Sequence, residues 1–187
     1  RAASAIAEAD ALLICAGAGM GVDSGLPDFR GPEGFWKAYP PFAKQNLRFE
    51  DIADPVWFHR DPTLAWGFYG HRLNLYRATV PHDGFRLLRQ MAEVKKFGAW
   101  VFTSNVDGQF QKAGFDAERI AECHVSIHFL QCNLLCQVLP DSDNGLGALF
   151  RHMASSERPL FWSADDTTII LDETTMRAQL PLPTCPD

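Results

Sequence analysis

The chain has 187 residues, of which 47% are hydrophobic and 21% charged, a composition typical of a globular domain that buries one core. Its net charge of −6 gives no electrostatic footprint for direct binding to nucleic acid or an anionic membrane, which would need clustered Lys and Arg. No apolar run reaches the roughly 20 residues that span a bilayer and no signal peptide opens the sequence, which predicts a soluble, cytoplasmic protein.

The five cysteines are an odd number, and in a reducing compartment they indicate buried thiols or metal ligands rather than structural disulfides. We expect Cys15 and Cys123 to be small buried side chains. The sequence begins at Arg1 without an initiator methionine and stops soon after a proline-punctuated stretch, so we expect a fragment or a processed chain.

The first elements predict a strand that runs into a phosphate-binding turn. Residues 2–9 favour a helix, residues 11–16 a buried parallel strand, and residues 17–31 a glycine-rich loop. Glycines after a buried strand let the backbone approach a phosphate, whose oxygens the N–H groups of the next turn can bind. The loop therefore predicts a site for a nucleotide diphosphate.

Two common nucleotide motifs do not match this loop. The dehydrogenase fingerprint starting at Gly17 would need glycine where Val22 stands. A Walker-type loop would need Gly-Lys followed by Ser or Thr, and no such triplet follows. Hydride transfer and ATP or GTP hydrolysis are therefore disfavoured.

The next segments alternate between helix and strand. Residues 34–76 are rich in aromatic residues and proline, which favours short helices packed as a small lobe. Residues 82–95 have helical spacing of apolar side chains, and residues 99–102 form an apolar stretch typical of a buried strand. This alternation predicts an α/β fold.

Three polar residues after the second strand could carry chemistry. The amide of Asn105 and the carboxylate of Asp107 suit a carboxamide and a ribose, although Asn and Asp in such positions also form simple Asx turns. His124 is a candidate general base, since imidazole titrates near pH 6.5, although a loop histidine is also often structural.

Three motifs in the same order resemble the sirtuins, the NAD-dependent protein deacylases. Residues 17–30 match the pattern G-A-G-x-x-x-x-S-G-x-P-D-F-R, residues 103–108 read Thr-Ser-Asn-Val-Asp-Gly, and residues 122–126 read Glu-Cys-His-Val-Ser where that family has its catalytic histidine. The resemblance covers residues 1–136 and implies a Rossmann-like parallel sheet with a helical insertion lobe. It also implies that C-terminal parts of the family's fold are missing.

The resemblance implies a reaction and a cofactor. NAD would bind at the glycine loop, an acylated lysine of a protein would be the substrate, and the acyl group would pass to ADP-ribose with release of nicotinamide. His124 would act as the base and Asn105 beside the nicotinamide, so these two would be the catalytic residues. The implied cofactor-binding residues are Gly17, Ala18, Gly19, Asp28, Phe29, Arg30, Ser104, Asn105, Asp107 and His124.

Tyr69 and Arg72 are the candidate residues for binding the acyl group of the substrate. They are similar to the Tyr-x-x-Arg pair of sirtuins that accept succinyl- or malonyl-lysine, where phenol and guanidinium hold the acyl carboxylate. A packed aromatic residue beside a surface arginine is the equally simple structural alternative.

The resemblance also implies a zinc module. Structural zinc takes four thiolate or imidazole ligands. The candidate ligands are Cys132, Cys136 and Cys185. One ligand is missing, so two alternatives stand: an empty site, or a site completed by His128, His152 or water. The implied domain layout has residues 1–33 and 77–130 as the Rossmann-like core, 34–76 as the helical lobe and 131–187 as a partial zinc module.

Three positions depart from the family pattern: Gly21 replaces Ser or Thr, Ser104 replaces Gln, and Val125 replaces the glycine after the catalytic histidine. A β-branched residue such as Val125 does not readily adopt positive φ. Two alternatives to a deacylase therefore stand: an NAD glycohydrolase or ADP-ribosyltransferase, and a non-catalytic module that binds NAD or ADP-ribose.

Overall fold

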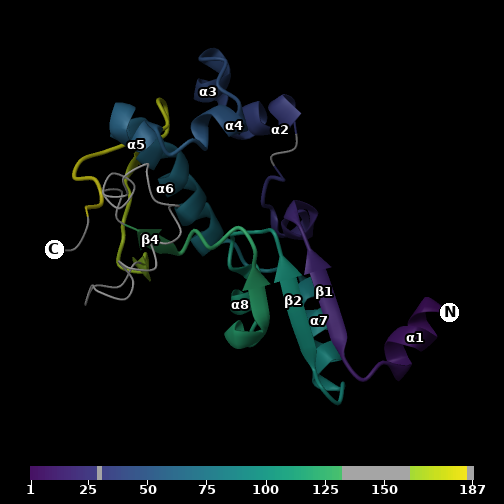
Figure 1. Cartoon of the computed structure of the whole chain (residues 1–187). Helices are drawn as coiled ribbons and strands as arrows, with labels where there is room; N and C mark the ends of the chain where they lie inside the picture. The colour runs from purple at the N-terminus through teal and green to yellow at the C-terminus, as the bar shows by residue number, and fades with distance from the viewer. Residues whose placement is uncertain (29–30, 132–160, 185–187) are drawn as a thin grey trace, which may run out of the picture. The chain divides into compact units, whose positions relative to one another are not determined.

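The computed structural model describes residues 1–28, 31–131 and 161–184 (Figure 1). The chain divides into two compact units, Arg1–Ile127 with Ile169–Leu182, and His128–Thr168 with Pro183–Asp187. The helices are α1 (Ala2–Glu8), α2 (Gly31–Ala38), α3 (Pro40–Lys44), α4 (Phe49–Ile52), α5 (Trp57–Arg60), α6 (Pro62–Ala78), α7 (Asp83–Glu93) and α8 (Gln109–Lys112), with 3₁₀ helices η1 (Ala18–Ser24) and η2 (Ala117–Arg119). The strands are β1 (Leu12–Ala16), β2 (Ala99–Thr103), β3 (Ile120–Glu122), β4 (Phe129–Gln131), β5 (Phe161–Ser163), β6 (Leu171–Asp172) and β7 (Arg177–Ala178).

The sheet of the first unit is parallel in the order β1-β2-β3, and the three strands run side by side in Figure 1. One face packs on helices: Val101 from β2 is buried with Phe85 from α7 and Phe110 from α8. Helices between parallel strands bury that face, so the predicted α/β class with a parallel sheet is confirmed.

The opposite face of this sheet is exposed. Leu13 is 71% exposed, and its register partner Trp100 is 45% exposed. Cys15 is also exposed and pairs in register with Phe102, which is 49% exposed. The prediction of a buried strand at 11–16 with a buried Cys15 is therefore wrong for this face, because side chains alternate along a strand and Leu12, Ile14 and Ala16 lie on the other, partly buried side.

The helical lobe, α2 to α6, surrounds an aromatic core. Phe35, Tyr39, Phe42 and Phe68 are each fully buried, and their rings make stacked and edge-to-face contacts at centroid distances from 5.0 to 6.2 Å. Such pairs add roughly 0.5–1.5 kcal/mol each beyond their buried area. The aromatic-rich sequence of 34–76 thus forms the helices that were expected of it.

A hairpin of β6 and β7 packs on α6. A Cβ added to Gly67 would lie 2.0 Å from the Met176 carbonyl oxygen, and one added to Gly70 would lie 2.5 Å from Ile169. These two glycines let the hairpin lie directly on the helix backbone. Met176 itself belongs to the aromatic core of the lobe.

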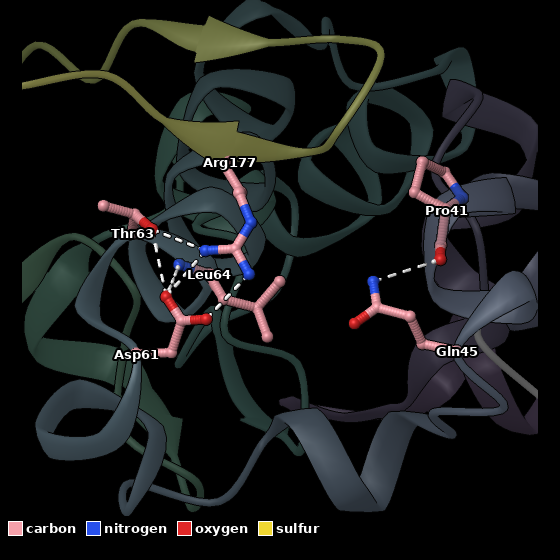
Figure 2. A network of polar contacts seen from close by, with 6 residues as sticks. All are labelled: Pro41, Gln45, Asp61, Thr63, Leu64 and Arg177. Carbon is pink, nitrogen blue, oxygen red and sulfur yellow. Dashed lines mark hydrogen bonds and ion pairs between the residues drawn. The ribbon is translucent and has the colours of Figure 1, made fainter.

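An ion pair fixes the same hairpin to the start of α6. Asp61 caps the helix by accepting the Leu64 N–H, and Arg177 binds both Asp61 oxygens at 2.7 Å and Thr63 Oγ1 at 2.7 Å (Figure 2). Figure 2 also shows the amide of Gln45, which follows α3, donating to the carbonyl of Pro41 in the first turn of that helix. Residues 169–182 therefore belong with the first unit, although the predicted zinc module of 131–187 included them.

In the second unit, β4 and β5 form an antiparallel pair with Phe129 opposite Ser163 and Gln131 opposite Phe161. The Ala164 N–H donates to the His128 carbonyl, which extends the pairing. Across the described stretches of both units, no helix combines the length and the apolar character needed to cross a bilayer.

Candidate functional site

The three sequence motifs meet at the carboxyl edge of the parallel sheet. Ala16 ends β1, Thr103 ends β2 and Glu122 ends β3, so each motif continues from a strand end at the same edge. Hydrogen bonds join the successive loops there: the Ser104 N–H donates to Ala16 O at 3.1 Å, and the Cys123 N–H donates to Thr103 O at 3.0 Å. Ligands of open α/β sheets bind at this edge.

The first motif forms a short 3₁₀ helix, η1, immediately after Gly17. A Cβ on Gly19 would meet nothing within 4 Å, and one on Gly17 would come only to 3.5 Å from Ser104 Oγ. Packing against the described residues thus does not require glycine at either position. The space beside Gly19 leaves room for a bound group such as a diphosphate.

Gly21 and Gly25 are glycines for a different reason. Gly21 is buried, and a Cβ there would lie 3.1 Å from Leu26. Gly25 ends η1 with φ +86°, a left-handed conformation that favours glycine. Glycine at position 21, where the family has Ser or Thr, therefore leaves the room that Leu26 occupies.

Asn105 links the first two loops. Its side-chain amide donates to Gly17 O at 2.9 Å, and its backbone N–H donates to Thr103 Oγ1 at 3.0 Å. Ser104 is exposed beside it. The carboxamide group expected near a nicotinamide thus sits directly at the start of the glycine loop.

Asp107 is buried, and its Oδ1 accepts the Gln109 N–H at 3.0 Å. This is the Asx turn that the sequence left open as the alternative role. Gln109 is itself 1% exposed, and among the described buried side chains its Oε1 is the oxygen without a hydrogen-bond partner. A buried acceptor of this kind ordinarily binds a water or a ligand group.

His124 lies exposed in the turn after β3, which the Val125 N–H closes by donating to Glu122 O. Val125 has φ +65°, a left-handed conformation that is strained for a β-branched side chain. Burial raises the pKa of Glu122, a hydrogen bond from Gln111 lowers it, and the charge of Asp107 raises it further. The base candidate is therefore next to a strained residue and a carboxyl group that binds protons more readily than usual.

Tyr69 and Arg72 both lie on α6, but their polar groups have different partners. The Tyr69 hydroxyl donates to Ala53 O at 2.8 Å. Arg72 is 9% exposed, and its Nε and Nη2 donate to the Tyr76 hydroxyl at 3.1 and 3.0 Å. Burial raises the pKa of both tyrosines, and the positive charge of Arg72 partly offsets this rise.

The structure places the remaining predicted residues as follows. Asp28 is partly buried near Gly34. Cys123 is exposed rather than buried, because the turn after β3 carries it away from the packed face, so that expectation is wrong. Phe29, Arg30, Cys132, Cys136, His152 and Cys185 lie outside the described residues, and within the described ranges no group of three potential metal ligands occurs.

His82 is a residue near the site that the sequence did not single out. Its ring nitrogens contact the Gly84 N–H and Met20 O at 3.0 Å each, and its backbone N–H donates to Ser24 Oγ at 3.0 Å. The sequence signal was slight, since histidine is not among the preferred N-cap residues, and Met20 and Ser24 lie about 60 positions earlier.

The model of the Sir2 family matches residues 17–151. The chain is 32% identical over 121 residues to an NAD-dependent protein deacylase of Aquifex aeolicus, covering 65% of this chain and 46% of that protein. It is 36% identical over 135 residues to an NAD-dependent protein deacetylase of Saccharolobus solfataricus, covering 71% and 49%. The chain thus spans about half the length of these relatives.

Solved structures give the same likeness. A crystal structure of a Sir2 homologue–NAD complex superposes with a TM-score of 0.55 and 29% identity, covering 70% of this chain and 46% of that one. A Sir2 homologue mutant in complex with 2′-O-acetyl ADP ribose superposes with a TM-score of 0.57 and 28% identity, covering 70% and 48%. With its motif loops gathered at one sheet edge and its sequence matched across most of its length, the chain belongs to the Sir2 family.

Proposed function

We propose that this chain forms the cofactor-binding and base-containing part of an NAD-dependent protein lysine deacylase. The observation that carries the proposal is the meeting of three loops at one sheet edge: the loop at Gly17, the loop at Asn105 and the turn at His124. The relatives named as NAD-dependent deacylases support the same activity.

The glycine loop would hold the diphosphate of NAD. Backbone N–H groups at Gly17 to Gly19 would donate to phosphate oxygens, and the space beside Gly19, where an added Cβ would meet nothing within 4 Å, supports this role. Asn105 would bind the nicotinamide carboxamide, and Asp107 and Ser104 would lie toward its ribose. NAD would supply ADP-ribose as the acyl acceptor and nicotinamide as the leaving group.

The second substrate would be an acylated lysine of a protein. The acyl carbonyl oxygen would attack C1′ of the nicotinamide ribose and displace nicotinamide. His124 is exposed at the same edge and would accept a proton from a ribose hydroxyl, which then attacks the acyl carbon. One water molecule would be consumed as the bond between the acyl carbon and the lysine nitrogen breaks. The Sir2 homologue mutant solved with 2′-O-acetyl ADP ribose contains the acylated acceptor that such a reaction produces. Free lysine, nicotinamide and acyl-ADP-ribose would be the products.

Acyl preference and zinc are finer parts of the proposal. Arg72 is a cation buried among aromatic rings of the lobe, which supports a preference for an acidic acyl group. Equal turnover of acetyl and succinyl peptides, unchanged by Arg72→Met, would contradict that preference.

The proposed zinc ligands remain Cys132, Cys136 and Cys185. Zinc content measured by mass spectrometry after Cys132→Ser tests them.

Incubation with NAD and acetyl-lysine or succinyl-lysine peptides tests the main proposal. We expect peptide-dependent nicotinamide and acyl-ADP-ribose, detected by mass spectrometry, that disappear with His124→Ala and persist with His59→Ala. His59 is a matched control because it is exposed on α5. Nicotinamide released without peptide would favour a glycohydrolase, and NAD binding without turnover would favour a binding module.

A further inference from the structure

We propose that His82 is a positioning residue that holds the glycine loop in the shape that binds the NAD diphosphate. His82 precedes α7 and contacts η1, the 3₁₀ helix that follows Gly17. The inference rests on the proposed function, because it assigns His82 to the loop that would bind NAD.

Both ring nitrogens of His82 are used, and their partners fix the tautomer. Nδ1 lies 3.0 Å from the Gly84 N–H and must accept from it, because a backbone N–H can only donate. Nε2 therefore carries the proton and donates to Met20 O at 3.0 Å. A single neutral ring thus caps α7 with one nitrogen and binds η1 with the other.

The ring has little freedom to leave this position. A Cβ on Gly84 would lie 2.4 Å from His82 Cε1, so the ring fills the space that a side chain there would need. The ring also makes an edge contact with the buried Phe85, at a centroid distance of 5.0 Å. Packing therefore holds the imidazole between α7 and η1.

Two hydrogen bonds from His82 bind η1 at separate points. The ring donates to Met20 O, and the backbone N–H of His82 donates to Ser24 Oγ at 3.0 Å near the other end of η1. η1 begins immediately after Gly17 and includes Ala18 and Gly19, whose backbone would face the phosphates. The orientation of those N–H groups thus depends on His82.

Two variants separate capping of α7 from anchoring of η1. In His82→Asn the shorter side chain can still accept the Gly84 N–H as an N-cap, but it does not reach Met20 O. In Gly84→Ala the histidine remains, but the new Cβ displaces its ring. His59→Asn, on an exposed histidine of α5, is the matched control.

Hydrogen exchange and ADP-ribose binding are the two readouts. We expect His82→Asn and Gly84→Ala to speed amide exchange in η1 and weaken ADP-ribose binding by roughly five- to tenfold, the effect of one neutral hydrogen bond. The first-turn amides of α7 should stay protected in His82→Asn. Unchanged exchange in η1 and unchanged affinity in His82→Asn would overturn the proposal.

A third readout needs no variant. The ¹⁵N chemical shifts of the His82 ring in the unmodified protein should report the tautomer protonated at Nε2, and a ring protonated at Nδ1 would overturn the proposal even if both variants failed to fold. Absence of ADP-ribose binding by the unmodified protein would instead contradict the proposed function, while exchange in η1 and the ring shifts would still test His82.

Discussion

Val125 combines a β-branched side chain with a φ of +65° immediately after the candidate base His124. Positive φ brings Cβ close to the backbone carbonyl, and branching at Cβ removes the rotamers that would relieve the contact. Strain of this kind costs of the order of 1–3 kcal/mol and persists only where surrounding contacts impose it. The hydrogen bond from the Val125 N–H to Glu122 O is one contact that holds this turn.

Val125→Gly should raise the free energy of unfolding by about 1 kcal/mol, because relief of 1–3 kcal/mol of strain exceeds the roughly 0.5–1 kcal/mol that glycine costs in chain entropy. Urea unfolding followed by circular dichroism measures this change. Val94→Gly is the control, since Val94 is exposed and has φ −90°, and it should give no gain. A loss of stability in Val125→Gly would mean that the turn is not strained.

At the scale of residues, the sequence predicted which loops belong to the site, because the order of the motifs and the ends of the strands determine this. It predicted that the Gly17 loop and the Asn105 loop would serve one site, and a direct hydrogen bond joins them. It did not predict the role of His82, because the partners of its ring and backbone come from a distant segment. The prediction that Cys15 is buried was wrong, because an apolar run does not reveal which face of a sheet is covered.

The contact between α6 and the β6–β7 hairpin is the main feature at the scale of elements. Gly67 and Gly70 give the helix a bare surface, and Met176 reaches from the hairpin into the aromatic core. Backbone-to-backbone contact of this kind leaves no room for even one methyl group.

Gly67→Ala should therefore lower the free energy of unfolding by about 3 kcal/mol, because its Cβ would lie 2.0 Å from Met176 O and the hairpin would have to move. Thermal unfolding measured by calorimetry tests this. Gly34→Ala on α2 is the matched control: a Cβ there would come no closer than 4.0 Å to Asp28, so the better helix propensity of alanine should leave stability equal or slightly higher. Equal effects of the two substitutions would contradict the close packing.

The Asp61–Arg177 pair should make the hairpin contact pH-dependent. The hydrogen bond from Arg177 lowers the pKa of Asp61 below its ordinary value of 3.8, with smaller lowering from Thr63 and Leu64 against a rise from burial. A lowered folded-state pKa gives stability that is complete above the ordinary carboxyl range and is lost as the pH falls through the folded value. The pair should thus contribute about 1 kcal/mol at neutral pH and progressively less below about pH 4.

Asp61→Asn tests this contribution, because asparagine can still cap α6 but carries no charge. Between about pH 5 and about pH 2, unfolding by urea should show a steeper loss of stability in the unmodified protein than in Asp61→Asn. Arg177→Gln should behave like Asp61→Asn, and the double variant should add little to either. Parallel pH curves for all of these proteins would show that the pair contributes nothing.

Helix and strand positions were the best predicted elements. The stretches 2–9 and 82–95 contain α1 and α7, and the stretch 99–102 covers β2 except for its last residue, Thr103. The hairpin was not predicted, because its strands have two residues each and owe their position to α6 rather than to their own pattern. The glycine loop was expected without helical structure and instead contains η1.

The exposed face of the parallel sheet is the main feature of the first unit as a whole. Leu13, Trp100 and Phe102 lie on this face, and the Arg119 guanidinium covers part of it by stacking on Trp100 at 4.5 Å. Parallel sheets in α/β proteins ordinarily have both faces covered. An apolar surface left open in this way promotes binding of apolar dyes and self-association.

Phe102→Lys should therefore reduce the fluorescence of 8-anilinonaphthalene-1-sulfonate bound to the protein and reduce self-association in sedimentation velocity. It should change stability by less than about 1 kcal/mol, because Phe102 is 49% exposed. Val80→Lys is the control, since Val80 is 78% exposed but lies outside the sheet. Unchanged dye binding in Phe102→Lys would show that this face is not the apolar surface that the dye detects.

The hairpin also sets an order of events during synthesis. Asp61 and Arg177 are 116 positions apart, and the lobe core that includes Phe35 and Phe68 takes Met176 from the late segment. When α6 emerges from the ribosome, the hairpin that packs on its glycine surface has therefore not yet been made. The second and third strands of the sheet, and the loops that follow them, are translated before the hairpin. The sheet edge can assemble as the chain emerges, but the lobe closes only after Ala178, at the end of β7, has been translated.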